Sequence, residues 1–542
     1  MRATARELCD QAGRLFSDRM PLVSLWQEIA DHFYPERADF TASRNVGTDF
    51  ASHLSTSYPI LARRDMGNAF STMLRTDDWF QIETDDEDTN DDTDARRWLE
   101  RSTKVLRRAM YDRVSAFVRA TKEADHDFAA FGQAVISTEL SPKRDHLVYR
   151  CWHLRDVVWC ENYAGEVDTV YRKWKPKLRQ AVQTFGLDRL SATVRQRFEK
   201  EPYCDIEFIH VVMPGDMYEG ERKFSTAWVS IWIETETYHV VEEVGVHHMA
   251  YSVPRWQTVS GSQYANSPAT VCALPDARLI QSMTLTLLEA GEKAVNPPMV
   301  AVREAIRQDI SLFAGGVTWV DAAYDERLGE VLRPLSQDKS GLPWGQEVRT
   351  DTREMIAEAF FLSKLSLPMN DGAMTAYEVS QRVEEYIRNA RPLFEPMEQN
   401  YNGALCESTF NLMMANNGFG PLRDIPQSLS DREIKFKFAS PLSHARGQQA
   451  MQRYQITRQL LADAVATDPA MAAMVRVPVA LRDVMTDVGV PAEWIASEEE
   501  IEAAELSAAQ QQQQQQLLAT LGQGAAIAKD AAQAQALTAR AQ

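Results

Sequence analysis

The residues best suited to binding a metal ion stand in an acidic run early in the chain. Asp86, Asp88 and Asn90 have the spacing of the first three ligands of an EF-hand calcium loop. That loop also needs glycine at its sixth position and a bidentate glutamate at its twelfth, where this chain has Asp91 and Arg97. We therefore interpret the run as an acidic surface loop. Its carboxylates interact favourably with the positive N-terminal end of the helix that follows.

Histidine and cysteine provide two further candidate sites. His247 and His248 follow a predicted strand, and adjacent side chains on a strand point to opposite faces, so they make a poor metal pair. We expect both on the surface. Cys151, His153 and Cys160 fit no zinc-site spacing, and we expect the two cysteines to be buried strand residues.

Recognised catalytic motifs are missing from the sequence. It contains no GxxxxGK[ST] phosphate-binding loop, no HExxH and no GxSxG. Carboxylate pairs are numerous because the chain has 77 acidic residues, and none stands out by its context. We expect no catalytic residue, no resident metal ion and no cofactor. A nuclease or hydrolase function would rest on scattered carboxylates alone.

Composition limits the classes of partner. The 542 residues allow three or four domains, and 44% of them are apolar, which is enough to build cores. The net charge of −19 repels phosphate backbones, which disfavours tight, sequence-specific binding of nucleic acid. Six cysteines without a CxxC pair indicate reduced thiols. We expect no signal peptide and no membrane span, since no long apolar run occurs.

The first half of the chain predicts an α+β fold. Apolar periodicity predicts amphipathic helices over residues 3–33, which end at Pro35, and a further helix over 61–74. A short strand is expected at 79–82 and a helix at 95–111. The pattern then changes to a period of two, which predicts an antiparallel or mixed sheet. Its strands are expected at 147–152, 157–159, 167–174, 206–212, 228–233 and 238–246, with a helical stretch at 177–199.

A long helical segment over residues 347–418 dominates the second half. It is broken once, at 366–372, and its second arm starts with a capping-box pair, Thr375 and Glu378. The stop is expected at Asn416-Asn417-Gly418. A helix at 274–295 precedes it. One helix therefore leads into the insert between the two, and the other leads back from it.

The insert between these helices is short and compact. It has strand candidates at 299–302, 317–320 and 330–332 and a Pro/Gly-rich exit at 341–345. A strand at 433–438 and helices at 445–466, 470–475 and 479–488 complete the pattern. The end of the chain is rich in alanine and glutamine, with seven consecutive glutamines from Gln510, and cannot form a core alone.

The order of local sequences resembles one family, the portal proteins or head-to-tail connectors of short-tailed, T7-like bacteriophages. Each piece is weak and the ordered set is specific. The pieces are Leu74–Ile82, Asp127–Ala134, Pro254–Trp256, Tyr264–Ala269, Leu274–Asp276, Met374–Val379, Ser440–Leu442 and Gly489–Pro491. The chain departs from the family at Ala265 and Asn266, where a glycine and a basic residue are usual, which puts any special role of these positions in doubt.

The resemblance implies a portal-type α+β fold. It has an α/β wing, a two-helix stem, a small α/β clip, a helical crown and an Ala/Gln-rich C-terminal helix. The implied parts are the wing at 1–267, stem helices at 268–296 and 346–365, the clip at 297–345, a tunnel loop at 366–374, a long wing helix and strand at 375–440, the crown at 441–505 and a C-terminal barrel or tail at 506–542.

The same resemblance implies a function. Twelve copies would form a ring at one capsid vertex, through which double-stranded DNA is packaged with the terminase large subunit, retained and ejected. Further implied partners are tail adaptor and nozzle proteins, the major capsid protein and the scaffolding protein. The implied location is the virion, and the host cytoplasm during assembly. The alternative that we keep open is a helical scaffold or adaptor protein of the virion that never contacts DNA.

Two groups of site residues follow from the resemblance. A short loop with a polar tip, in which Gly372 allows unusual backbone angles, would contact DNA in the channel. That group is Lys364, Leu367, Pro368, Met369, Asn370, Asp371 and Gly372. The clip would dock the terminase and the adaptor through Arg327, Arg333, Asp338, Lys339 and Trp344.

Overall fold

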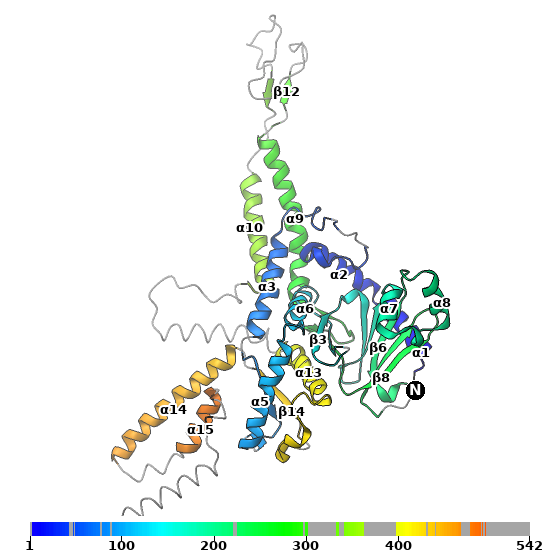
Figure 1. The fold of residues 1–542 in the computed structure, drawn as a ribbon. Helices are drawn as coiled ribbons and strands as arrows, with labels where there is room; N and C mark the ends of the chain where they lie inside the picture. The colour runs from blue at the N-terminus through cyan, green and yellow to red at the C-terminus, as the bar shows by residue number, and fades with distance from the viewer. Residues whose placement is uncertain are drawn as a thin grey trace, which may run out of the picture. The chain divides into compact units, whose positions relative to one another are not determined.

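The computed structural model describes most of the chain up to residue 494. The described ranges are residues 3–42, 49–75, 78–86, 89–90, 92–141, 143–220, 225–295, 299–301, 332–334, 341–362, 397–429, 432–438, 441–467 and 477–488, with a few isolated residues between them (Figure 1). The chain divides into two compact units. The first comprises Met1–Trp79 and Leu106–Phe419, and the second Phe80–Val105 and Gly420–Gln542.

The first unit begins with the two predicted amphipathic helices, α1 (Ala5–Asp18) and α2 (Met20–Phe33). Thr4 and Glu7 form a capping box at the start of α1, in which the Thr4 backbone N–H donates to Glu7 Oε2 at 2.8 Å. This pairing satisfies N–H groups that have no partner inside the helix. The predicted helix at 61–74 is α3 (Tyr58–Leu74), and α6 (Phe117–Phe131) packs against it.

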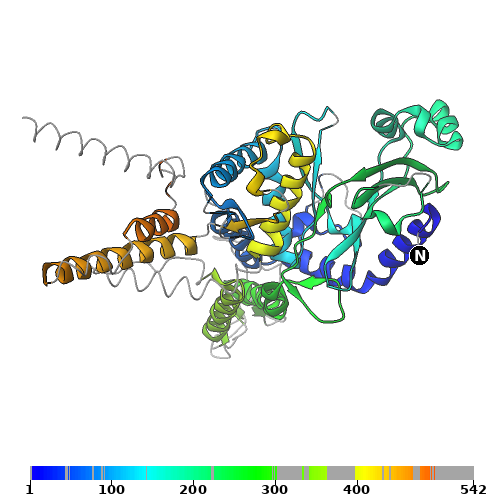
Figure 2. The same ribbon diagram turned by 90° about the horizontal axis from the view of Figure 1, so that it is seen from below.

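A five-stranded antiparallel sheet with the order β4-β5-β6-β7-β8 confirms the predicted change of period. Its strands are β4 (Val157–Glu161), β5 (Val167–Trp174), β6 (Phe208–Pro214), β7 (Trp228–Glu234) and β8 (Val240–Val246). Leu8 and Ala12 of α1 join Val211 and Ile231 in a core on one face. Alternate residues of a strand face opposite sides, so Phe208 instead packs against α7 and α8. Figure 2 shows the sheet between these helices.

The predicted helical stretch at 177–199 is two helices, α7 (Leu178–Phe185) and α8 (Ala192–Lys200). Gly186 ends α7 with φ of 86°, a backbone conformation that glycine adopts without a steric penalty. Ser191 then caps α8, because its side chain accepts a hydrogen bond from the Val194 N–H.

A three-stranded sheet with the order β3-β2-β9 lies beside α6. It consists of β2 (Ile136–Leu140), β3 (Leu147–Cys151) and β9 (Tyr251–Ser252). Strand β2 was not predicted, because its five residues, Ile-Ser-Thr-Glu-Leu, do not alternate between apolar and polar types. A small antiparallel pair, β10 (Gln257–Thr258) and β11 (Ala265–Asn266), follows before the long helices.

The helix stop predicted at Asn416-Asn417-Gly418 is confirmed by a helix that ends at Ala415. Residues 363–396 of the predicted long helix lie outside the described part of the chain. A π-helical segment (Glu398–Gly403) leads into α13 (Ala404–Ala415). Asn417 has a left-handed φ of 56°, and the Gly418 N–H donates to the Met413 carbonyl at 2.7 Å. This is the hydrogen bond that closes a Schellman C-terminus, with asparagine at the position that usually holds glycine.

The second unit contains the antiparallel pair β1 (Phe80–Thr84) and β14 (Ile434–Phe438). The first part of α5 (Thr93–Met110) packs with this pair, and Thr103 Oγ1 accepts a hydrogen bond from the Ile82 N–H at 3.0 Å. Farther along, α14 (Pro441–Thr467) packs against α15 (Val477–Val488). These elements confirm the predicted strand at 433–438 and two of the predicted helices. The predictions at 470–475 and in the glutamine-rich end lie outside the described residues.

Candidate functional site

Two of the site residues implied by the resemblance are described by the structure. Arg333 lies in β13 (Leu332–Pro334), which pairs with β12 (Met299–Ala301) and starts two residues later than the predicted strand. Trp344 lies in helix α10 (Gly341–Ala359), where a non-helical exit of the insert was predicted. The other residues lie outside the described part of the chain: Lys364, Leu367, Pro368, Met369, Asn370, Asp371, Gly372, Arg327, Asp338 and Lys339.

The error at the start of α10 has a simple cause. Pro343 is the third residue of the helix, and the first four backbone N–H groups of a helix have no partner within it. Proline therefore removes no hydrogen bond there, and its fixed φ suits a first turn. The Pro/Gly-rich sequence at 341–345 is a helix start.

The outgoing helix, α9 (Pro268–Val295), also starts earlier than the predicted Leu274. It contains Pro275, which is exposed, while its buried face carries residues of the first unit's core. These buried residues are Ala269, Thr270, Ala273, Leu274, Ala277, Ile280 and Thr284. Their spacing of three and four residues makes one continuous stripe. Burial of this stripe outweighs the hydrogen bond that the proline removes.

The two helices form an antiparallel pair (Figure 1). Gly345 in the first turns of α10 is buried, and a β-carbon built on it would lie 2.8 Å from Leu287 Cδ2 near the end of α9. The glycine therefore permits close approach of the two backbones. At the other end of α10, Ile356 and Phe360 are fully buried, and the ring centroids of Phe360 and Phe33 lie 5.4 Å apart.

Polar contacts attach α9 to the N-terminal part of the chain. The Gln281 side chain accepts hydrogen bonds from the Ser55 and Thr56 N–H groups, at 2.7 and 3.0 Å, and donates to the Thr56 carbonyl at 2.8 Å. Arg278 pairs with Glu28 of α2. The base of the helix pair is thus fixed to the first unit, as a projecting arm requires.

The pair exposes large apolar side chains on both helices. Leu285 and Leu288 of α9 are 52% and 60% exposed, and Met355 and Trp344 of α10 are 55% and 65% exposed. Val271 and Leu279 add to the same helices' exposed apolar surface. Scattered apolar side chains are normal on a protein surface, but a concentration on one helix pair indicates an interaction surface.

The returning helix is interrupted before the position predicted for its end. Apolar periodicity predicts that this arm extends to Leu365, whereas α10 ends at Ala359 and the helix is broken at Phe361, which has a left-handed φ of 56°. Leu362 is helical again, and residues 363–365 lie outside the described part of the chain. The Phe361 N–H donates to the Glu358 carbonyl at 2.9 Å, a tighter turn than an α-helix makes. Burial of Phe360 against Phe33 holds this turn in place.

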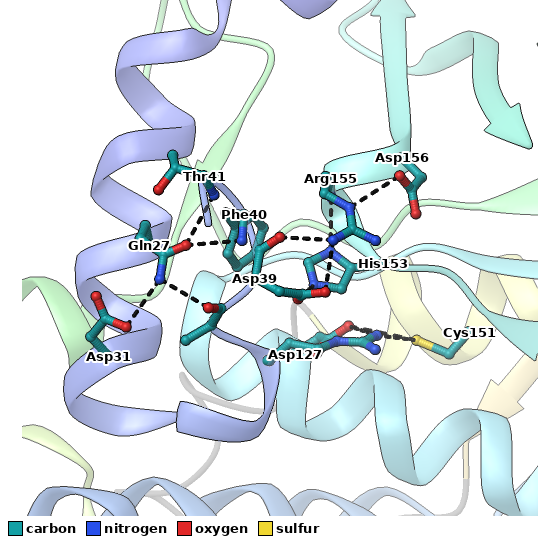
Figure 3. A network of polar contacts seen from close by, with 12 residues as sticks. Gln27, Asp31, Asp39, Phe40, Thr41, Asp127, Cys151, His153, Arg155 and Asp156 are labelled. Carbon is teal, nitrogen blue, oxygen red and sulfur yellow. Dashed lines mark hydrogen bonds and ion pairs between the residues drawn. The ribbon is translucent and has the colours of Figure 1, made fainter. Parts of the chain in front are cut away.

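Two of the candidates, Cys151 and His153, belong to a polar network around residues 35–41 (Figure 3). Arg37 donates to both carboxylate oxygens of Asp127, at 3.0 and 2.7 Å, and Cys151 Sγ lies 3.7 Å from Asp127 Oδ2. Burial raises the pKa of the Cys151 thiol well above its usual value, and Asp127 adds to the effect. A thiol held protonated is a poor nucleophile and a poor metal ligand.

His153 is also engaged within this network (Figure 3). Its Nδ1 accepts a hydrogen bond from the Arg155 N–H, so its Nε2 carries the proton and donates to Asp39 Oδ1 at 2.6 Å. Burial alone would raise the pKa of Asp39, but the hydrogen bond and charge of His153, together with Arg155, lower it to about 2. Cys160 is half-buried and lies elsewhere, beside Gln11. The expected burial of both cysteines therefore holds for Cys151 only.

The remaining metal candidates have structural explanations. His247 is exposed, as expected, but His248 is buried, because the two side chains point to opposite sides. Asn90 of the acidic run accepts a hydrogen bond from the Thr84 N–H at 2.9 Å, and so caps the end of β1. Within the described ranges, no three His, Cys, Asp or Glu side chains are grouped to hold a metal ion. No described helix is long and apolar enough to cross a membrane.

Comparison with known proteins identifies relatives along most of the chain. The probable portal protein of Bordetella phage BPP-1 is 28% identical over 450 residues, which cover 81% of this chain and 79% of that protein. The portal protein of Salmonella phage epsilon15 is 23% identical over 462 residues, covering 82% and 80%. A chain from the virion of a native gene transfer agent particle aligns over 80% of this chain and 94% of its own length, with 10% identity and a TM-score of 0.35, which is too distant to carry an argument.

The family model described as bacteriophage head to tail connecting protein matches residues 5–495. The match covers nearly all of the first unit, the second unit up to residue 495, and the whole of the α9–α10 pair. This chain belongs to the bacteriophage head to tail connecting protein family.

Proposed function

We propose that this protein is the portal subunit of a phage capsid, which assembles into a twelve-membered ring around a channel for double-stranded DNA. Family membership already places it in the virion, where head and tail join. The proposed ring admits the genome during packaging with the terminase large subunit, retains it, carries the tail adaptor and nozzle proteins, and releases the DNA at infection. The major capsid and scaffolding proteins are proposed as its neighbours during assembly.

The observation that carries this proposal is the uncovered apolar surface of the α9–α10 pair. Leu285, Leu288, Met355 and Trp344 are all more than half exposed, on a projecting arm whose base is fixed in the core. Burial of apolar surface contributes roughly 25 cal/mol per Å². A ring of identical copies packs each arm between two others, so it covers this surface on both sides without an open edge.

The charges of the two helices suit a wall along which DNA slides. Helix α9 has three acidic and two basic residues, and α10 has four acidic and two basic residues. Each cation that neutralises a phosphate adds salt-dependent affinity, and therefore resistance to sliding. A wall without an excess of cations avoids that resistance.

Replacing Leu285 and Leu288 together by serine is expected to abolish or strongly weaken ring assembly, because both side chains become buried between neighbouring arms. Native mass spectrometry measures the number of chains per particle, and negative-stain imaging shows whether a central hole is present. Val259, which is 56% exposed in a loop outside the helix pair, provides the matched control as Val259→Ser. A double variant that forms rings as well as the wild type does would contradict the proposal.

Deleting residues 367–372 is expected to leave ring assembly intact and to reduce the amount of DNA that particles package and retain. The reason is that this segment is proposed to contact DNA while the arms hold the ring together. The measurement is the DNA content of purified particles assembled with the deleted protein. Normal DNA content would favour the alternative, a scaffold or adaptor protein that never contacts DNA.

A further inference from the structure

The corner between α5 and α6, residues 110–117, has a rigid backbone. Ser115 is fully buried, and its hydroxyl donates to the Met110 and Asp112 carbonyls at 2.5 and 2.7 Å. Asp112 Oδ1 accepts a hydrogen bond from the Val114 N–H at 3.1 Å, and the Tyr149 N–H donates to the Ser115 carbonyl at 2.9 Å. Ala116 is held at a φ of 57°. The backbone of the corner is therefore already ordered, so binding there carries little cost for ordering the backbone.

Four exposed cations surround this corner in a protein of net charge −19. They are Arg108, Arg113, Arg119 and Lys122, and none forms an ion pair with any residue that the structure describes. The nearby carboxylates are fewer. Asp78 is already paired with Arg107, which leaves Asp112 and the exposed Glu123. These unpaired cations give the corner a positive charge, opposite in sign to the net charge of the whole protein.

Large apolar side chains stand among these cations. Tyr111 is 41% exposed, Val114 55% and Val118 59%. Val118 and Lys122 are four residues apart on α6, so they share one face of the helix, and Arg119 lies beside them. We name Arg108, Tyr111, Arg113, Val114, Val118, Arg119 and Lys122 the corner patch. Exposed apolar side chains interspersed with charged ones have the composition of a protein-docking surface.

We propose that the corner patch docks an acidic, amphipathic helix of a partner protein. The carboxylates of such a helix complement the four cations, and its apolar face covers Tyr111, Val114 and Val118. Duplex DNA fits less well, because phosphate contacts use cations and polar groups and leave the three apolar side chains uncovered. The proposal concerns a surface away from the α9–α10 pair and does not depend on the ring.

Fluorescence anisotropy with the full-length protein tests this assignment. The probe is a labelled synthetic helix with glutamates on one face and leucines on the other. Two comparison probes are the same peptide with serine in place of leucine and a short duplex DNA. The first variant carries Arg113→Gln, Arg119→Gln and Lys122→Gln, and the second carries Val114→Ser and Val118→Ser. The matched control removes three exposed cations from α7 and α8, through Arg179→Gln, Arg195→Gln and Lys200→Gln.

The amphipathic acidic peptide is expected to bind the wild type and the matched control equally. Each patch variant is expected to bind it about tenfold more weakly, and added salt to weaken the wild-type complex. Four outcomes would overturn the proposal. These are no binding of the peptide, equal binding of the serine peptide, tighter binding of duplex DNA, or loss of self-assembly in the patch variants. The last outcome would assign the patch to a second copy of this chain.

Discussion

Replacing Gly132 by alanine is expected to lower the free energy of unfolding by about 4 kcal/mol or more, the range reserved for severe structural conflicts. Gly132 ends α6 with φ of 73°, which costs a residue with a β-carbon about 1 to 2 kcal/mol. The new β-carbon would also overlap the carbonyl group of Asn266 and the backbone nitrogen of Ser267. Gly132 cannot move aside, because its N–H donates to the Phe128 carbonyl and its own carbonyl accepts from the Trp256 N–H.

Urea unfolding of the full-length protein, followed by circular dichroism, measures this loss. Gly165→Ala is the matched control, since Gly165 has a φ of 80° and no other atom lies within 4 Å of the place where its β-carbon would stand. The control isolates backbone strain and should cost only about 1 to 2 kcal/mol. Equal losses for the two variants would mean that the contact with Asn266 contributes nothing.

This contact explains two positions at which the chain departs from the family's usual residues. Ala265 is fully buried, and its N–H donates to Gln133 Oε1 at 3.0 Å. Asn266 presents its backbone to Gly132 and pairs with Gln257 across β10 and β11. The contacts described for Asn266 are made by its backbone, so a basic side chain is not required there, whereas the buried position of Ala265 suits a small residue.

Elements with a strong local pattern could be predicted from the sequence. The change from a period of 3.6 to a period of 2 located the strands of the five-stranded sheet within a few residues. The predicted helix bounds were wrong where contacts with residues distant in sequence decide whether a segment is helical. Pro275 remains inside α9 because α9 buries one face in the core, and no local rule reports that burial. Gly186, by contrast, is a local signal for the break between α7 and α8, although one continuous helical stretch was predicted there.

The residues of the candidate site show the same division. The helix pair and its connecting strands follow from periodicity, whereas the exposure of Leu285 and Trp344 appears only once the packing is known. The partners of Cys151 and His153 are Asp127, Arg37 and Asp39, which lie 24 to 114 residues away from them in sequence. Sequence spacing could reject a zinc site there, but it could not identify the network that occupies the position.

Replacing Arg75 by methionine is expected to lower the free energy of unfolding by about 3 to 5 kcal/mol, because it leaves a buried carboxylate without its counter-charge. Arg75 pairs with Asp125, and both side chains are almost completely buried. The Tyr401 hydroxyl donates to Asp125 Oδ1 at 2.9 Å, and Arg75 donates to Asn402 Oδ1 at 3.2 Å. Tyr401 and Asn402 are both buried in the π-helical segment, so their hydrogen bonds tie the start of α13 to α6 and to the end of α3.

Thermal and urea unfolding at several pH values test this expectation, with Arg64→Met as the matched control. Arg64 lies on the same helix and pairs with Asp65, but both side chains are more than half exposed, so the control should change stability by less than about 0.5 kcal/mol.

Burial raises the pKa of Asp125, and Arg75 opposes that rise, so the removal of Arg75 raises the pKa of Asp125 further. The folded Arg75→Met variant then binds a proton more readily than its unfolded chain does, so its stability relative to the wild type should recover as the pH is lowered. If the variant's loss of unfolding free energy were the same at every pH, Asp125 would not be the charged group left without a partner.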